Sequence, residues 1–381
     1  MMRKTKLIVP MAAIAAILLS GCSQTTRQVS AAVVSQESET VTAASEETAK
    51  AEAEASSAGT TQEGDEAVNS TGITTNAGTE ILFSQLEHYG EGGSTVYYTK
   101  DITPEALVAV YEALGWTPEG KTGVKISTGE PPASHYLSPD LMKNLVQMVG
   151  GTIVECNTAY GGSRANTAMH KQVAEDHGYT AIADVDILDE DGSMSIPVEG
   201  GVRLPEDFVG SHFANYDSYI ILSHFKGHAM AGLGGAIKNI SIGFGSGSEG
   251  KQWIHSGGTS RTSWMGGEQD HFLEAMADAG KGVSDYMNQG KNIIYINVMN
   301  NLSVDCDCDG NASAPDMHDI GILASTDPVA LDQACVDLVH VSPDSKSLVE
   351  RMESRNGFHT LESGENIGLG SRSYSLVSID D

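Results

Sequence analysis

The chain has few cysteines, and none of them is spaced for a common iron–sulfur module. Its 381 residues include five, which are Cys22, Cys156, Cys306, Cys308 and Cys335. No Cys-x-x-Cys sequence occurs, and a ferredoxin needs several closely spaced thiolates to hold its cluster. The sequence therefore excludes an ordinary ferredoxin module.

Basic residues are also scarce. The chain has 22 Lys and Arg residues against 51 Asp and Glu residues, and its formal net charge at pH 7 is -29. Proteins that bind nucleic acid neutralise its phosphate groups with clustered basic side chains. We therefore expect no nucleic-acid partner, although a local basic pocket for a small anion is compatible with this composition.

Residues 23–78 lack aromatic side chains and have few aliphatic ones. The segment consists mainly of Ser, Thr, Ala, Gln, Gly and Glu, so it has too little apolar surface to offset the entropy lost on ordering. We predict a disordered, acidic linker over 23–78, followed by one domain over 79–381. The functional residues are expected in that domain.

Residues 1–22 have the pattern of an export signal. Arg3, Lys4 and Lys6 precede an apolar run over 7–19 that is too short to span a bilayer stably. The sequence Leu19-Ser20-Gly21-Cys22 resembles a bacterial lipoprotein signal. This resemblance implies that Cys22 is acylated and anchors the domain to the extracytoplasmic face of the cell membrane. The alternative is an ordinary secretory signal with an incidental cysteine.

Strand and helix patterns alternate along the domain, which predicts a layered α/β fold. The strand at 219–223 is continuously apolar, as expected for a parallel sheet covered by helices on both faces. Helix starts are marked by capping residues such as Thr103 and Ser138, each followed by proline. We expect strands over 94–99, 122–128, 152–156, 219–223, 292–299, 319–324 and 373–379, and helices over 103–114, 138–149, 167–177, 271–290 and 327–339.

The densest group of reactive side chains follows the apolar strand at 219–223. Function in such folds gathers in loops at the carboxyl ends of strands. Neutral His binds metals or transfers protons, and a desolvated Lys becomes a nucleophile or a cofactor attachment point. The candidates are His224, Lys226, His228, Lys238 and His255, together with Gly234 and Gly235, which let the backbone approach a ligand closely.

Two earlier loops are candidates for anion binding. Residues 129–136 precede a capped helix, whose N-terminus attracts anions. In 157–164, Gly161-Gly162 is followed by Arg164, which is suited to pair with a carboxylate or phosphate. The alternative for both loops is an ordinary turn, with Arg164 at the surface.

The sequence Asp305-Cys306-Asp307-Cys308-Asp309 supports several interpretations. Two thiols and three carboxylates suit a metal site for zinc or iron, which we expect His255, or Asp316, His318 and Asp319, to complete. A calcium loop is a second interpretation, although no Glu stands at the twelfth position. A third is a disulfide, either from one of the two cysteines to Cys156 or Cys335, or between Cys306 and Cys308, although that bridge closes a very small ring.

Five stretches together resemble the domain of unknown function 362 family, whose members are often labelled iron–sulfur centre proteins. The resemblance implies one family domain across most of the region after the linker. Many members carry a ferredoxin segment after the position of His255, but 257–270 contains no cysteine here. That difference argues against an iron–sulfur cluster. The stretches are 129–139, 157–170, 225–239, 306–308 and 321–332.

A fainter similarity connects the chain with the lactate racemase family, whose nickel cofactor is attached to a lysine. His228 and Lys238 have the spacing of that family's catalytic histidine and cofactor lysine, and His255 lies near the position of its metal-binding histidine. The similarity implies acid/base chemistry at His228, a cofactor bond at Lys238 and metal ligation at His255.

These observations favour a membrane-anchored enzyme or redox protein that uses a metal or cofactor on a small molecule. We place catalysis at His224, His228 and Lys238, and cofactor contacts at Arg164 and Lys226. The expected metal is iron, zinc or nickel. The alternative is a non-catalytic, lipid-anchored protein that binds a small ligand.

Overall fold

The computed structural model describes residues 71–265 and 267–380. The predicted signal, the acylation of Cys22 and most of the predicted linker lie outside these residues. Strand β1 (Gly72–Thr74) buries Ile73 and lies before residue 79, within the stretch predicted to be a linker. Among the described residues, the helices are too short or too polar to cross a membrane.

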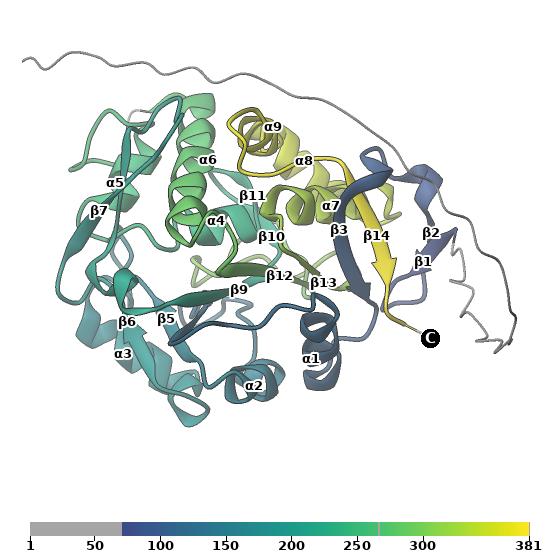
Figure 1. Ribbon diagram of the computed structural model, residues 1–381, viewed down its shortest axis with the longest axis horizontal. Coiled ribbons are helices and arrows are strands. Elements are labelled where there is room, and N and C mark those ends of the chain that lie inside the picture. The colour runs from purple at the N-terminus through teal and green to yellow at the C-terminus, as the bar shows by residue number, and fades with distance from the viewer. Residues whose placement is uncertain (1–70, 266, 381) are drawn as a thin grey trace, which may run out of the picture. The chain divides into compact units, whose positions relative to one another are not determined.

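An eight-stranded sheet forms the centre of the domain (Figure 1). Neighbouring strands are parallel except where β13 pairs antiparallel with β12 and β3, so the prediction of a largely parallel sheet is confirmed. The spatial order is β14 (Tyr374–Ser378), β3 (Tyr89–Thr99), β13 (Gly321–Ser325), β12 (Ile293–Met299), β9 (Ser218–His224), β4 (Thr122–Lys125), β5 (Thr152–Glu155) and β6 (Val185–Ile187).

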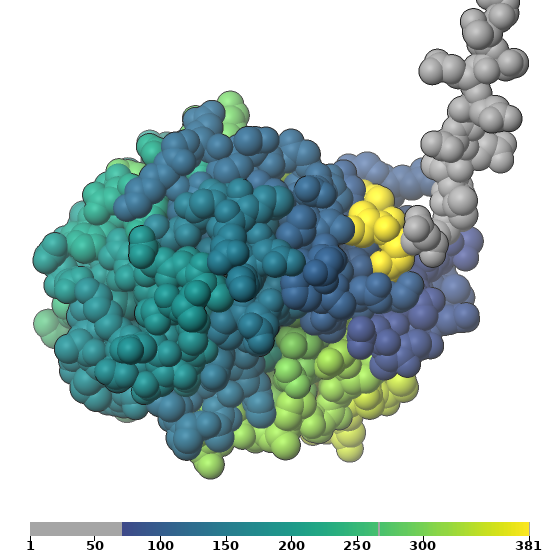
Figure 2. Space-filling model, turned by 90° about the horizontal axis from the view of Figure 1, so that it is seen from below, coloured from purple at the N-terminus to yellow at the C-terminus, as the bar shows by residue number. Residues whose placement is uncertain are grey.

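Helices cover both faces of the sheet, as predicted. Even-numbered residues of β9 such as Ile220 pack on the face of α1 (Pro104–Ala113), α2 (Pro139–Met148) and α3 (Thr167–Asp176). Figure 2 shows the surface on this side, formed mainly by the first half of the domain. Odd-numbered residues such as Ile221 pack on the opposite face with α4 (Ala236–Ile240), α6 (Gln269–Tyr286), α7 (Pro328–Val341), α8 (Lys346–Ser354) and α9 (His359–Asn366).

The predicted helix starts are confirmed by their capping contacts. The side chain of Thr103 accepts from the backbone N–H of Ala106, and that of Ser138 accepts from Asp140. The α7 start is capped by Asp327. Each cap is followed by proline at the first helical position, where a missing N–H costs nothing.

Several short elements were not predicted. Three antiparallel hairpins lie outside the large sheet, and α5 (Gly250–His255) occupies only six residues. The hairpins join β1 to β2 (Glu80–Leu82), β7 (Ser193–Pro197) to β8 (Glu206–Gly210), and β10 (Lys226–His228) to β11 (Gly232–Gly234).

Asp207 in β8 gives a prediction about pH. Its side chain is fully buried, and within the described chain its Oδ2 has no hydrogen-bond partner. Burial raises the pKa of Asp207 from 3.8 to about 7. The unfolded chain loses this proton near pH 3.8, whereas the folded chain keeps it up to about pH 7. The free energy of unfolding therefore falls as the pH rises from 3.8 to about 7.

Replacing Asp207 by Asn should therefore raise the free energy of unfolding at pH 7.5 by about 2–4 kcal/mol. The gain should shrink towards pH 4, where wild-type Asp207 is close to protonated. Urea unfolding at the two pH values measures this, with the exposed Glu175→Gln as the matched control. An equal effect at both pH values would contradict the assignment.

Candidate functional site

The candidate site is a cavity of about 470 Å³ at the carboxyl ends of the central strands. From β4 the chain continues outward to β5 and β6, whereas from β9 it continues in the other direction to β12. Ligands bind at such a switch point in open α/β sheets. The cavity wall includes Glu130, Arg164, Lys226 and Cys308, so the four polar loops singled out in the sequence meet at this cavity.

Lys125, at the end of β4, forms the floor of this cavity. Its side chain is 1% exposed. The ammonium donates to Glu155 Oε1 at 2.8 Å, to Asn239 Oδ1 at 2.9 Å and to the carbonyl of Ile126 at 2.7 Å. Burial lowers the pKa of Lys125, and the charge of Glu155 opposes this shift. A satisfied ammonium in this position holds β4, β5 and α4 together.

Glu155 links this ammonium to Arg164. Its Oε2 accepts from the Thr128 N–H at 3.1 Å and lies 3.6 Å from Arg164 Nη1. Burial acts to raise the pKa of Glu155, but Lys125 and Arg164 outweigh it and lower the pKa to about 2. Arg164 also donates to Glu130 Oε2 at 3.1 Å. The predicted anion-binding arginine is thus buried and already paired with carboxylates.

Asp307 makes a second buried charge group with His224 and Lys226. Its Oδ1 lies 2.9 Å from His224 Nδ1, and its Oδ2 accepts from Lys226 Nζ at 2.6 Å. The other nitrogen of His224 lies 2.6 Å from the carbonyl oxygen of Asn300. Burial opposes ionisation of Asp307, but Lys226 and His224 lower its pKa well below the usual range. Both nitrogens of His224 face acceptors, so here it orients the loop, and its catalytic role stays a prediction.

Lys238 differs from the other lysines in the cavity wall. It lies in the first turn of α4, and within the described chain its ammonium has neither a hydrogen-bond acceptor nor a carboxylate partner. Burial, reinforced by the charge of Lys226, lowers the pKa of Lys238 to about 7. In about half of the molecules, Lys238 is therefore a neutral amine at pH 7.

The glycines before Lys238 allow close approach of two side chains of this chain, and the predicted approach of a ligand stays a prediction. A Cβ at Gly235 would lie 2.3 Å from Asp332 Oδ1, and one at Gly234 would lie 3.2 Å from Lys238 Cδ. Asp332 in α7 accepts from the N–H groups of Ala236 and Ile237 at 2.8 and 2.9 Å. A carboxylate from α7 thus holds the start of the helix that carries Lys238.

His228 is a buried neutral histidine with a defined tautomer. Its Nδ1 accepts from the N–H groups of Met230 and Ala231 at 3.2 and 2.8 Å, so the ring proton is on Nε2. Burial, then the charge of Lys238, lowers the pKa of His228 well below its usual value. The ring is therefore set up as a hydrogen-bond donor, and the predicted acid/base role stays a prediction.

His255 has the opposite tautomer. Its Nδ1 lies 2.6 Å from the carbonyl oxygen of Lys251, to which it donates, and this leaves the lone pair of Nε2 available. The ring stacks on Phe272 with centroids 4.9 Å apart, and it lines the cavity. Burial lowers the pKa of His255 to about 4. A neutral ring oriented by a backbone carbonyl fits a metal ligand, because metals bind this form.

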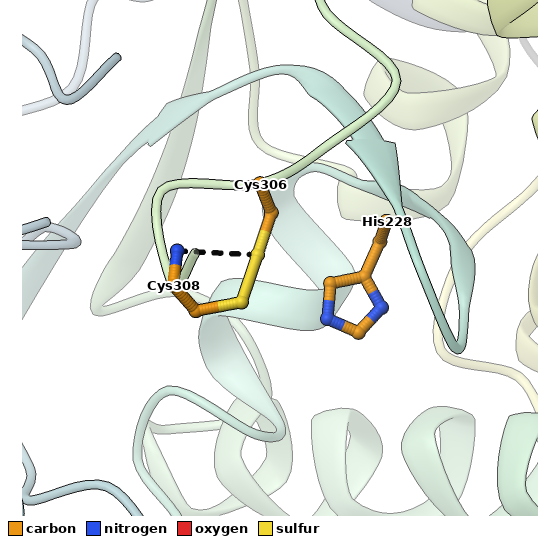
Figure 3. A group of neighbouring side chains, drawn as sticks. All are labelled: His228, Cys306 and Cys308. Atoms are coloured by element: carbon orange, nitrogen blue, oxygen red, sulfur yellow. Dashed lines mark hydrogen bonds between the residues drawn. A yellow bond between two sulfur atoms is a disulfide. The ribbon is translucent and has the colours of Figure 1, made fainter. Parts of the chain in front are cut away.

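Cys306 and Cys308 form a disulfide with each other. The expected bridges to Cys156 or Cys335 are wrong, since both of these are free and buried in the core. The residue grouped with the two sulfurs is His228, with the ligand atoms within 4.8 Å of one another, rather than His255 (Figure 3). Because cysteine binds metals as a thiolate, a metal role for this pair stays a prediction that applies only after reduction.

A family model described as "Domain of unknown function (DUF362)" matches residues 122–337, which is more than half of the chain. The chain belongs to the DUF362 family. The match runs from β4 to α7 and so includes every residue described above at the cavity. No curated protein matches this DUF362 chain in sequence.

Two solved structures are similar at low identity. The lactate racemase apoprotein from Thermoanaerobacterium thermosaccharolyticum is 14% identical with a TM-score of 0.37, over 71% of this chain and 61% of that one. A structural genomics target from Thermotoga maritima is 10% identical with a TM-score of 0.33, over 69% of this chain and 58% of that one. The DUF362 chain thus spans about three fifths of the length of each.

Three charged residues that build this DUF362 site were not predicted from the sequence, and a fourth was predicted only in part. Lys125 and Glu155 are charged residues at the ends of two strands that are otherwise uncharged, and that contrast was an available signal. Asp332 lies within the buried part of α7, where an unpaired carboxylate is costly. Asp307 was noticed only as a possible ligand, although its partners His224 and Lys226 were both singled out.

Proposed function

We propose that this DUF362 protein is an enzyme acting on a small anionic molecule, and that Lys238 forms a covalent bond with a carbonyl carbon of its cofactor or substrate. The observation that supports this is the unpartnered amine of Lys238 in a cavity of about 470 Å³, with its pKa lowered to about 7. In an imine-forming step the amine lone pair attacks the carbonyl carbon, and the carbonyl oxygen leaves as water.

The charge of the cavity supports an anionic reactant. Lys125, Arg164 and Lys226 are paired with carboxylates. Lys238 and Lys251 have no carboxylate partner in the described chain, and the Lys251 ammonium donates only to the carbonyl of Gly245. Lys251 therefore gives the cavity wall a positive charge that no carboxylate of the described chain pairs with, and Lys238 adds to it in its protonated form; this charge attracts a carboxylate or phosphate group.

His255 is the residue that supports a metal-dependent form of this chemistry. Its Nε2 lone pair is available on the cavity wall, so it would ligate a metal ion brought in with a cofactor. Such an ion would supply Lewis-acid or redox chemistry. His228, with its proton on Nε2, would donate a hydrogen bond to a reactant oxygen.

A labelling experiment with pyridoxal 5′-phosphate tests the proposal, because this probe is both an aldehyde and an anion. The full chain is incubated with the probe at pH 7, reduced with borohydride and mapped by peptide mass spectrometry. Lys238 should be labelled well before exposed lysines such as Lys346. Labelling confined to exposed lysines would overturn the proposal.

The alternative of a non-catalytic binding protein, with an anion at Arg164 and Lys226, has less support. Both cations already have buried carboxylate partners, so an added anion would have to displace one of them. Binding of inorganic phosphate that is lost in Arg164→Gln but kept in Lys238→Met would favour it.

We also propose that the domain is attached to the extracytoplasmic face of the cell membrane through a lipid on Cys22. The support is the charged start, the short apolar run and the sequence Leu19-Ser20-Gly21-Cys22. Cells grown with an alkyne fatty acid should incorporate label into the wild-type chain but not into Cys22→Ser. Equal label in both would refute the anchor.

A further inference from the structure

The disulfide between Cys306 and Cys308 lies in the wall of the cavity. Cys306 is 4% exposed, Cys308 is half-buried, and both line the cavity. Only one residue separates them, so the bridge closes a very short loop and restrains the unfolded chain much less than a long-range bridge would. A mainly structural purpose is therefore a poor explanation for it.

Asp307 holds the two cysteines in place from the opposite side of the loop. Its carboxylate is bound by His224 and Lys226, and its carbonyl accepts from the Glu130 N–H at 2.7 Å. The carbonyl of Cys308 accepts from the Tyr160 hydroxyl at 3.1 Å. These contacts do not involve the sulfur atoms, so reduction of the pair removes none of them.

Hydrogen-bond donors surround the sulfurs. The N–H of Cys308 donates to Cys306 Sγ at 3.2 Å. A ring nitrogen of His228 and both sulfurs lie within 4.8 Å of one another, and the Nε2 side of the ring faces the disulfide in Figure 3. The backbone contacts of Nδ1 place the ring proton on Nε2. Donors close to sulfur stabilise the thiolate that leaves when a disulfide is attacked.

We propose that Cys306 and Cys308 form a thiol–disulfide exchange site for small thiols that enter the cavity. A thiolate attacks Sγ of the more exposed Cys308, the bond between the two protein sulfurs breaks, and its electron pair leaves on Cys306. A second thiol attacks the sulfur of the first, which releases a small disulfide and the Cys308 thiolate. Two electrons pass from the two thiols to the protein pair, and their protons go to the new thiolates or to water.

This inference is independent of the amine chemistry of Lys238. The cavity size favours small thiols over a protein dithiol, and glutathione is a suitable probe. The full chain is equilibrated with mixtures of glutathione and its disulfide, quenched with acid, alkylated, and read peptide by peptide. The Cys306–Cys308 peptide should interconvert reversibly while the fold is retained.

Cys156 and Cys335 serve as internal references. Both are buried, and burial raises the pKa of each thiol, so they should stay unmodified in the folded chain. A pair that resists millimolar glutathione, or that is reduced only as Cys156 and Cys335 become reactive, would overturn the proposal. The second result would mean that reduction requires unfolding.

Variants test whether Cys308 is the cysteine that is attacked and whether His228 stabilises the leaving thiolate. In Cys306→Ser, Cys308 should form a lasting mixed disulfide with glutathione disulfide at least tenfold faster than Cys306 does in Cys308→Ser. His228→Leu should slow reduction of the pair roughly tenfold, as expected for one hydrogen bond to a charged group, and His228→Gln, which keeps a donor, should restore part of the rate. Equal rates within each pair of variants would contradict the assignment.

Discussion

Replacing Lys238 by Arg is expected to abolish borohydride-stable labelling of the cavity by pyridoxal 5′-phosphate. Arginine keeps a positive charge and a similar length, but it stays protonated and cannot form the imine. Exposed lysines should react as before in both proteins. The label at the peptide that contains residue 238 should therefore be lost completely.

The pH dependence of wild-type labelling gives a second measure of the same group. Because the pKa of Lys238 is lowered from 10.5 to about 7, its amine form appears as the pH rises through about 7. At that pH it should exceed the amine fraction of an ordinary lysine roughly a thousandfold. The initial rate at Lys238 should reach half of its maximum near pH 7.

Lys171→Arg is the matched control, because Lys171 is exposed and paired with Glu190 on the surface. This variant should leave labelling of Lys238 unchanged. If Lys238 reacts only above pH 9, as an ordinary lysine does, its environment does not activate it. The proposed covalent role would then be wrong even if the cavity binds the probe.

Glu155→Ala should lower the free energy of unfolding by about 3–5 kcal/mol, because it leaves a buried ammonium without its carboxylate. Lys125 is 1% exposed and loses its contact at 2.8 Å, while Arg164 loses one of its two carboxylate partners. Urea unfolding at pH 7 measures the change. Exposed Glu175→Gln should be close to neutral by comparison.

The loss in Glu155→Ala should depend on pH. The pKa of Glu155 is lowered from 4.5 to about 2 in the folded chain. The stabilising contribution of its charge is therefore present above about 4.5 and disappears as the pH falls towards 2. Wild type and variant should converge in this window, and a constant difference would show that lost packing, rather than charge, causes the effect.

A double variant tests whether Lys125 and Glu155 stabilise the fold as a coupled ion pair or as two independent side chains. Lys125→Met with Glu155→Leu removes both charges and fills similar volume, so it should be much less destabilised than Glu155→Ala. Additive losses would mean that the two side chains are not coupled.

The sequence predicted the fold well where local signals are strong. The caps at Thr103, Ser138 and Asp327 and the apolar strand at β9 identified elements that the structure contains. The antiparallel direction of β13 could not be read, because a buried strand is apolar in either direction. The short helix α4 was missed because five residues after a glycine-rich stretch show no helical period.

The site was predicted at the level of loops rather than contacts. Placing reactive loops at strand ends brought the correct segments together, but pairing partners are far apart in sequence. Lys125 meets Asn239 across 114 positions, and His224 meets Asp307 across 83. The sequence left the disulfide partners open, and the small ring counted against the Cys306–Cys308 bridge that the structure contains, whereas Cys156 and Cys335 are free and buried.

The contact between Asp332 and the start of α4 limits how Lys238 can act. Since two backbone N–H groups of α4 are bound to a side chain of α7, the helix cannot shift to carry the amine towards a reactant. Only rotation about the bonds of the lysine side chain remains. In the proposed reaction, a reactant must therefore bring its carbonyl carbon to the Lys238 amine, so molecules whose carbonyl lies at a slender end should react faster than those with bulk beside it.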